Sequence, residues 1–293
     1  MNNNILENKK KSELIDDSWI VRLWEWADYN NISDYKYVKN DYIDDEEEGY
    51  FVGLPRNKDD LLNLTELDLY SAQLTELPKE IGNLINLTKL NFYNNKLTEL
   101  PKEIGNLTNL TKLVLSYNKL TELPKEIGNL TNLTELNLTH NQLTGLPSEI
   151  RNLTNLTILN LWLNKFRELP KEIGNLTNLI ELNLSNNQLT WLPSEIKNLT
   201  NLTHLDLSRN QFSELPKEIG SLTNLTKLNL FDNQLIRLVR EIANLTNLVN
   251  LDFDYEQLVG FPEEIRNLPN LNAASSLRIL LVENLDQYWE SEF

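Results

Sequence analysis

Residues 110–132 read LTKLVLSYNKLTELPKEIGNLTN, and this 23-residue pattern recurs without insertion or deletion along most of the chain. With the residues of one unit numbered 1 to 23, positions 1, 4, 6, 11, 14, 18 and 21 are Leu, Ile or Phe in every unit. A fixed period of this kind predicts a stack of similar coils, each burying its apolar positions against its neighbours. The nine units begin at Leu64, Leu87, Leu110, Leu133, Leu156, Leu179, Leu202, Leu225 and Leu248.

The spacing within a unit predicts one strand and one short helical return. Apolar residues alternate around positions 4 and 6, which is the period of a strand. Position 15 is Pro in eight of the nine units, and Glu and Ile follow at positions 17 and 18. Pro suits the first turn of a short helix or 3₁₀ segment. Glu in that turn favours the helix dipole, so we interpret the Glu column as structural.

Two columns of Asn predict hydrogen-bond ladders between coils. Position 9 is Asn in seven units, and only the first and last units differ, with Ala72 and Glu256. A buried carboxamide there can satisfy backbone groups of its own coil and of the adjacent one. The two exceptions lie where terminal coils have a single neighbour. Position 23 is Asn in all nine units, and we expect a similar turn-satisfying role for it.

The residues Leu110, Leu113, Leu115, Asn118 and Leu120 fit the pattern L-x-x-L-x-L-x-x-N-x-L, which resembles leucine-rich repeat proteins. The tail L-P-x-E-I-x-N-L is similar to the 23-residue class found in bacterial and Ras-group repeat proteins. The resemblance covers residues 51–270. It implies an α/β repeat fold: a curved solenoid with parallel strands on its concave face, short helical or 3₁₀ returns on its convex face, and terminal caps.

Three regions follow from the phase of the repeat. Residues 1–50 are expected to form an amino-terminal helical cap and an acidic loop; the helix would run over 12–29 with Ile15, Trp19, Leu23 and Trp26 on one face. A partner-binding helix is the alternative. Residues 51–270 hold a degenerate half-unit and the nine full units. Residues 271–293 predict a carboxy-terminal cap, either a helix or a last edge strand.

Composition excludes several classes of function. A net charge of −16 and a pI near 4.6 argue against nucleic-acid binding and against docking on anionic lipid. The absence of a long apolar run argues against membrane insertion, and the lack of a standard signal peptide predicts a cytoplasmic protein or one exported by a signal-peptide-independent route.

Catalytic chemistry also lacks its usual residues. There is no Cys, and the two histidines, His140 and His204, fall in units four and seven, about 14 Å apart at the usual strand spacing, too far to share a metal ion. Glycine-rich phosphate loops and nucleophile elbows are missing. We therefore predict no catalytic residue, no cofactor, no metal site and no enzymatic activity.

The variable positions 3, 5, 7 and 8 are expected to point outward from the concave face. Unit five places Ile158, Trp162 and Leu163 together at mid-array, and exposed apolar groups in a concavity usually mark a contact site. The face is also polarised, from Lys89 and Lys112 to Asp206 and Asp252. The predicted partner-binding residues are Tyr70, Tyr93, Tyr117, His140, Ile158, Trp162, Leu163, Arg209, Phe231 and Tyr255, with Trp191 at the rim.

These observations predict a non-enzymatic protein–protein interaction module that binds a protein or peptide on its concave face. The resemblance implies a bacterial protein, host-directed if its organism is a pathogen. Two alternatives stay open. The chain could be the targeting part of a longer enzyme or signalling effector, or a self-associating structural repeat protein. We expect the protein to be a monomer, and self-association is the alternative.

Overall fold

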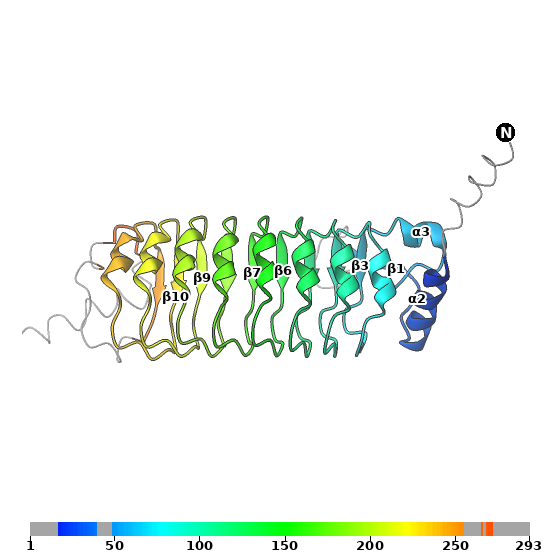
Figure 1. Cartoon of the computed structure of the whole chain (residues 1–293), viewed down its shortest axis with the longest axis horizontal. Coiled ribbons are helices and arrows are strands. Elements are labelled where there is room, and N and C mark those ends of the chain that lie inside the picture. The colour runs from blue at the N-terminus through cyan, green and yellow to red at the C-terminus, as the bar shows by residue number, and fades with distance from the viewer. Residues whose placement is uncertain (1–16, 40–48, 255–264, 266–267, 272–293) are drawn as a thin grey trace, which may run out of the picture.

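The computed structural model describes residues 17–39, 49–254, 265 and 268–271. Its body is a solenoid in which each repeat unit makes one coil, and the coils stack in sequence order (Figure 1). We call them coils 1 to 9. Nine strands form one parallel sheet in the order β3 to β11, and each coil returns through a short 3₁₀ helix on the opposite side. The predicted leucine-rich repeat architecture is therefore confirmed.

Each strand occupies positions 3 to 5 of its coil, and each 3₁₀ helix occupies positions 16 to 20. The strands are β3 Glu66–Asp68, β4 Lys89–Asn91, β5 Lys112–Val114, β6 Glu135–Asn137, β7 Ile158–Asn160, β8 Glu181–Asn183, β9 His204–Asp206, β10 Lys227–Asn229 and β11 Asn250–Asp252. The described 3₁₀ helices are η1 Lys79–Asn83, η2 Lys102–Asn106, η3 Lys125–Asn129, η4 Ser148–Asn152, η5 Lys171–Asn175, η6 Ser194–Asn198, η7 Lys217–Ser221 and η8 Arg240–Asn244.

The sheet pairs like with like. Position 3 of one strand lies beside position 3 of the next, so that Lys89 is flanked by Glu66 and Lys112. The seven apolar columns consequently stack in register and form one continuous core, in which residues such as Leu113 and Ile127 are fully buried. Since a three-residue strand has little pairing of its own, each coil depends on its neighbours for both hydrogen bonds and burial.

The Asn column at position 9 joins each coil to the one before it. The Asn141 Nδ2 donates to the carbonyls of Leu115 in coil 3 (2.9 Å) and Leu138 in its own coil (3.0 Å). Its Oδ1 accepts from the Leu120 amide at 3.0 Å. This confirms the predicted ladder. The same arrangement recurs at Asn95, Asn118, Asn164, Asn187, Asn210 and Asn233.

The Asn column at position 23 forms a second ladder on the surface. The Asn132 Nδ2 donates to the Thr108 carbonyl of the preceding turn at 2.8 Å, and every coil repeats this bond, as predicted. Thr at position 2 adds a third ladder, in which the Thr111 hydroxyl donates to the Thr88 carbonyl at 3.0 Å. Polar bonds between coils thus run on both sides of each strand.

The Pro column differs slightly from expectation. Pro101 stands one residue before the helix, with φ −65° and ψ 143°, so it is the N-cap and not part of the first turn. Its fixed φ still prepares the backbone for the turn. Val239 adopts nearly the same angles in coil 8, so Pro is favourable there without being required.

The amino-terminal segment lies against coil 1. It contains α2 Ser18–Tyr29, the antiparallel pair β1 Lys36–Lys39 and β2 Gly49–Val52, and α3 Lys58–Leu62. Residues 1–16, 40–48 and 272–293 lie outside the described residues, as do the predicted first turns of the helix, the acidic loop and the carboxy-terminal cap.

The buried face of α2 agrees only in part with the predicted one, since Leu23 is buried and Trp19 and Trp26 pack against the core. Ile20, Leu23 and Ala27 are its buried residues. Trp24, which was not assigned to the buried face, packs against the core and donates from its indole to the Pro55 carbonyl at 2.9 Å. Trp26 was expected to face inward and is only half-buried. The apolar spacing alone did not reveal that Ala27 would be fully buried, while Trp19, Trp24 and Trp26 pack against the core and stay partly exposed.

An ion pair fastens α2 to the first coil. Arg22 Nε lies 2.6 Å from Glu80 Oε1, and Glu80 is only 6% exposed. Burial raises the pKa of the Glu80 carboxyl, but the hydrogen bond and charge of Arg22 outweigh it, so the pKa lies below its ordinary value. The other Glu residues of this column have no such partner from α2, because only coil 1 lies under the helix.

Replacing Asn141 by Ala should destabilise the protein by about 2–4 kcal/mol, because several buried backbone groups lose their partner at once. Asn132→Ala serves as the matched control; it removes one exposed hydrogen bond and should cost less than about 1 kcal/mol. Urea unfolding measures both. Equal costs for the two variants would contradict the role assigned to position 9.

The Glu80–Arg22 pair predicts a pH dependence. A carboxyl whose pKa is lower in the folded protein contributes stability above its unfolded pKa and loses it as the pH falls through the folded value. Glu80→Gln should therefore cost about 1 kcal/mol at pH 7, because Arg22 is half-exposed, and this difference should vanish in acid. Glu103→Gln, at the same position of coil 2, should show no comparable change. Urea unfolding at neutral and acidic pH tests this.

Candidate functional site on the concave face

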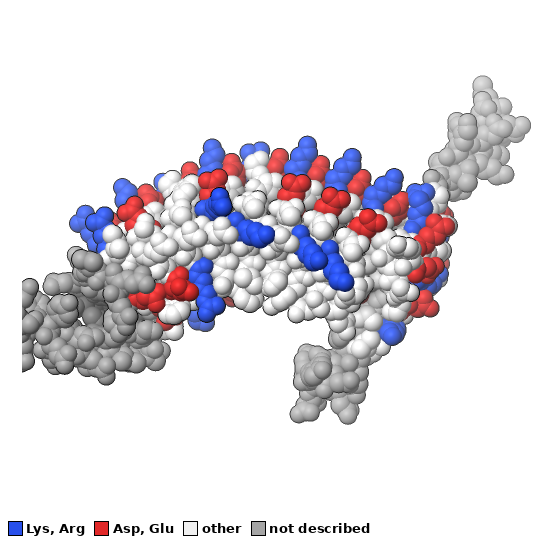
Figure 2. Space-filling model, turned by 90° about the horizontal axis from the view of Figure 1, so that it is seen from below, with Lys and Arg blue, Asp and Glu red and all other residues white. Residues whose placement is uncertain are grey.

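The solenoid has one charged outer edge and one varied inner face. Figure 2 shows it from below as an arc, with basic and acidic side chains alternating along the convex edge. Lys at position 16 and Glu at position 17 of the 3₁₀ helices supply this row. The concave face is built by positions 3 and 5 of the strands and by positions 7 and 8 of the following turn.

Position 5 orders the backbone of the concave turn, a role that the sequence reasoning missed. The Oδ1 of Asn160 accepts a hydrogen bond from the Trp162 amide at 3.0 Å. Asp206 does the same for the amide and hydroxyl of Ser208, at 2.9 and 2.7 Å. The signal was present, because position 5 is Asp or Asn in eight of nine units. Only coil 3 differs, where Val114 offers no acceptor.

Position 7 faces outward only where its side chain is large. Ser116, Thr139, Ser185 and Ser208 are buried, contrary to the expectation that the whole column points outward. Tyr70, Tyr93 and Phe231 are exposed, and Trp162 is half-buried. A small hydroxyl residue folds back against the turn that position 5 orders, whereas a large ring has no room there and projects from the face.

Position 8 has a left-handed backbone in every described coil. The φ values are +57° at Tyr117, +52° at His140 and +55° at Leu163. Coils 2 and 6 carry Asn94 and Asn186 at this position, a residue type that tolerates this region. His also occurs there often, but Tyr and Leu tolerate this region less well, so Tyr117 in coil 3 and Leu163 in coil 5 adopt it at a local energetic cost.

These residues form a row of rings across the first half of the array. Tyr93 and Tyr117 meet edge to face with centroids 5.3 Å apart, and Tyr117 stacks on His140 at 4.6 Å. The Trp162 carbonyl accepts from the His140 amide at 2.8 Å, so the next coil continues the row. We call Tyr93, Tyr117 and His140 the ring row. It brings together three of the predicted site residues.

Coil 5 carries the mid-array cluster of Ile158, Trp162 and Leu163. All three are half-buried, and Ile158 lies on β7 between Glu135 of β6 and Glu181 of β8. The remaining predicted residues are more scattered. Arg209 lies 3.9 Å from Asp232, and Trp191 is exposed at position 13, away from the strands. Tyr255 lies outside the described residues.

Charges on the first coils neutralise one another. Lys89 pairs with Glu66 at 2.7 Å, and Lys112 pairs with Glu135 at 2.9 Å. Asp68 is also engaged: its Oδ2 accepts from Asn91 Nδ2 at 3.0 Å, and burial raises its pKa against these hydrogen bonds. Of the lysines Lys89, Lys96, Lys112 and Lys119 that define the basic half of the predicted charge gradient, Lys89 and Lys112 are therefore matched by carboxylates on neighbouring strands.

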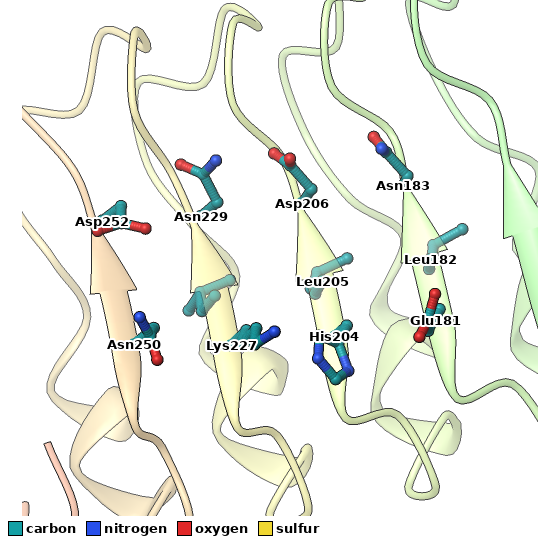
Figure 3. Close-up of a pocket in the computed structure, with 11 residues that line it drawn as sticks. Glu181, Leu182, Asn183, His204, Leu205, Asp206, Lys227, Asn229, Asn250 and Asp252 are labelled. Atoms are coloured by element: carbon teal, nitrogen blue, oxygen red, sulfur yellow. The ribbon is translucent and has the colours of Figure 1, made fainter. Parts of the chain in front are cut away.

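The last coils enclose a hollow of about 350 Å³ over β8 to β11. We call it the polar hollow (Figure 3). One wall is the position 3 row and the other the position 5 row, with the strand backbones as its floor. Sequence reasoning considered His204 only as a metal ligand and left out Glu181 and Lys227. The charged and polar lining residues are Glu181, Asn183, His204, Asp206, Lys227, Asn229, Asn250 and Asp252.

Within the described part of the chain, no three His, Asp or Glu side chains are grouped to hold a metal ion. The helices described there are too short or too polar to cross a bilayer. What the concave face offers is a shaped surface with aromatic, aliphatic and charged groups, a combination suited to recognition of another molecule.

Known proteins share this architecture. The leucine-rich repeat region family matches residues 56–143, 136–211 and 194–288. The structure resembles a leucine-rich repeat protein of Leptospira interrogans, with 44% identity, a TM-score of 0.69, and coverage of 74% of this chain and 62% of that one. A search of curated protein sequences gave no match. The chain belongs to the leucine-rich repeat family.

Two solved complexes are also similar. The peptide hormone receptor RGFR1 in complex with RGF2 shares 35% identity, with a TM-score of 0.61 over 71% of this chain and 35% of that one. The PEPR1–AtPEP1 complex shares 33% identity, with a TM-score of 0.66 over 75% of this chain and 32% of that one. The chain thus matches about a third of each of these two proteins and less than two thirds of the Leptospira protein.

The exception at coil 3 yields a prediction. Val114→Asn should stabilise the protein by about 0.5–1.5 kcal/mol, because it supplies the Ser116 amide with the acceptor found in the other coils. The reciprocal change, Asn160→Val, should cost a similar amount by removing the acceptor of the Trp162 amide. Urea unfolding compares the two. The changes in unfolding free energy must have opposite signs. If both variants are less stable than the wild type, the side chain at position 5 does not stabilise the turn by accepting this hydrogen bond.

Proposed function

We propose that this protein is a non-enzymatic recognition module that binds a peptide or a protein segment along its concave face. The bound segment contacts the ring row, the mid-array cluster and the polar hollow. The observation that carries this proposal is the backbone at position 8. Three successive coils hold Tyr117, His140 and Leu163 in a left-handed conformation, and the two coils that flank them carry Asn94 and Asn186 at the same position.

Stability does not explain this choice of residues. A bulky residue in the left-handed region costs on the order of 1 kcal/mol or more, and partly exposed apolar side chains lose little water on folding. The same coils place Trp162 and Ile158 beside these residues. Strain and apolar exposure concentrated on one concave patch are typical of a contact site, where a partner supplies the missing burial.

The similar structures add support. One of them is a plant peptide hormone receptor in complex with RGF2, so a protein of similar fold serves as a receptor for a peptide hormone. The identity to the Leptospira protein favours a bacterial origin. Side chains at positions 2, 9 and 23 also bond most coils to their neighbours, which favours a rigid array; little ordering entropy is lost when such a surface binds.

The proposal predicts the effect of giving coil 5 the residues of coil 6. Coil 6 has Ser185 and Asn186 at positions 7 and 8, so the Trp162→Ser/Leu163→Asn variant uses residues that the array already accommodates. Peptides selected from a displayed random library on the wild type should bind this variant on the order of 10-fold or more weakly. Isothermal titration with synthetic peptides gives the affinities.

Trp191→Ser is the control, since it removes an exposed Trp away from the strands and should leave binding within about 2-fold. Selected peptides that bind all three proteins equally would place the contact site elsewhere. A library that yields no binding peptide would contradict peptide recognition itself.

A further inference from the structure

The polar hollow differs from the rest of the concave face in its unpaired charges. Glu66 and Glu135 occupy position 3 and each pairs with a lysine on an adjacent strand. Glu181 occupies the same position on β8, but its in-register neighbours are Ile158 and His204, and no lysine lies beside it. Within the described residues, Glu181 and Lys227 form no ion pair.

Position 5 shows the same contrast. In coil 1 both oxygens of the Asp68 carboxylate accept hydrogen bonds, one from the Tyr70 amide and one from Asn91. In coil 7 the amide and hydroxyl of Ser208 both bind Oδ1 of Asp206, which leaves Oδ2 for a ligand. Figure 3 shows Asp206 in the row with Asn183, Asn229 and Asp252, facing the hollow between the two rows.

The residues that line the hollow give it a net negative charge. Three carboxylates, Glu181, Asp206 and Asp252, face one ammonium group, that of Lys227. The whole chain carries a net charge of −16, so the long-range field also attracts cations. An anion at Lys227 would lie near Asp206 and Asp252, whereas a cation beside Glu181 and Asp206 meets opposite charge and several amide oxygens.

The neighbouring coil supplies the second half of the site. Ile158 of the mid-array cluster pairs in register with Glu181, so an apolar surface and a carboxylate lie on adjacent strands, about 5 Å apart. Adjacent or next-but-one residues of an extended peptide span this separation. Lys227 lies on β10, two strands beyond Glu181. Because its ammonium group repels a cation, a bound cation is confined to the part of the hollow over β8 and β9.

We propose that the ligand is a basic peptide segment: a Lys or Arg side chain enters the polar hollow and pairs with Glu181 and Asp206, while a large apolar side chain one or two residues away packs on the mid-array cluster. This inference rests on the proposed function and adds the chemical class of the ligand and its direction. The apolar residue points toward coil 5 and the basic residue toward coil 7.

The test uses two double variants with the same change of charge. Glu181→Gln/Asp206→Asn neutralises the hollow, and Asn already serves as the acceptor at position 5 of the adjacent coil 6. Glu66→Gln/Asp68→Asn makes the same substitutions at the same positions of coil 1. Any loss of binding that reflects only the net charge of the protein must appear equally in both.

Short random peptides displayed on phage are selected on the wild-type protein, and the most enriched peptide is synthesised with and without its basic residue changed to Gln. The proposal expects enrichment of Lys or Arg next to a large apolar residue. It also expects the hollow variant to bind the basic peptide on the order of 10-fold or more weakly, with the coil 1 variant within about 2-fold of wild type. The Gln peptide should bind wild type and hollow variant alike.

Peptides without a basic residue, or equal weakening by the two double variants, would overturn this proposal while leaving concave-face recognition intact. Binding that is lost in Trp162→Ser/Leu163→Asn but unchanged in the hollow variant would do the same. If no peptide is enriched at all, the proposed function itself fails and this inference falls with it. Unfolding in urea verifies that both double variants keep wild-type stability.

Discussion

In coils 2 to 8 one carboxamide at position 9 links each coil to the coil before it, and the rest of the architecture depends on this link. Its nitrogen binds a carbonyl in each of two coils, and its oxygen binds an amide of the preceding coil, as at Asn141. A coil with a three-residue strand and a five-residue 3₁₀ helix has too little internal structure to fold alone. The ladder makes the register exact to the residue, and the apolar columns then pack without a gap.

The ladders at positions 2, 9 and 23 join neighbouring coils, so most side chains on the concave face are not needed for stacking the coils. Position 5 keeps a local role, since its oxygen orders the turn that carries positions 7 and 8. Positions 3, 7 and 8 can then differ from coil to coil without disturbing the fold. The array uses this freedom unevenly. Charges cancel between strands in coils 1 to 4, and rings and aliphatic groups occupy coils 2 to 5. The hollow in coils 6 to 9 contains Glu181 and Lys227, which form no ion pair within the described residues.

The repeated part of the fold could be predicted almost completely, and the unrepeated part could not. Comparison of the nine units shows which positions are invariant. In a stacked array an invariant Leu indicates a core position, and an invariant Asn indicates a hydrogen-bond ladder. The helix α2 occurs once, so its spacing of apolar residues left several faces open. Leu23, Trp19 and Trp26 pack inward as expected, but Ile20, Ala27 and Trp24 share that side of the helix. The recurrence of Asp and Asn at position 5 indicated that this side chain accepts a hydrogen bond. Its partner, the amide of position 7, could not be predicted, because the orientation of that amide depends on the conformation of the turn.

The sequence by itself determined the family, the coil length, the apolar columns and the ladder at position 9, because each of these repeats with the same period as the chain. Only the tertiary structure decided which concave residues act together. Glu66 and Lys89, or Tyr117 and His140, are 23 residues apart and become neighbours through the register of the sheet. Whether a charge is cancelled or left open, as for Glu135 and Glu181, depends on what the adjacent strand presents beside it. That pairing follows from stacking, and a single unit does not contain it.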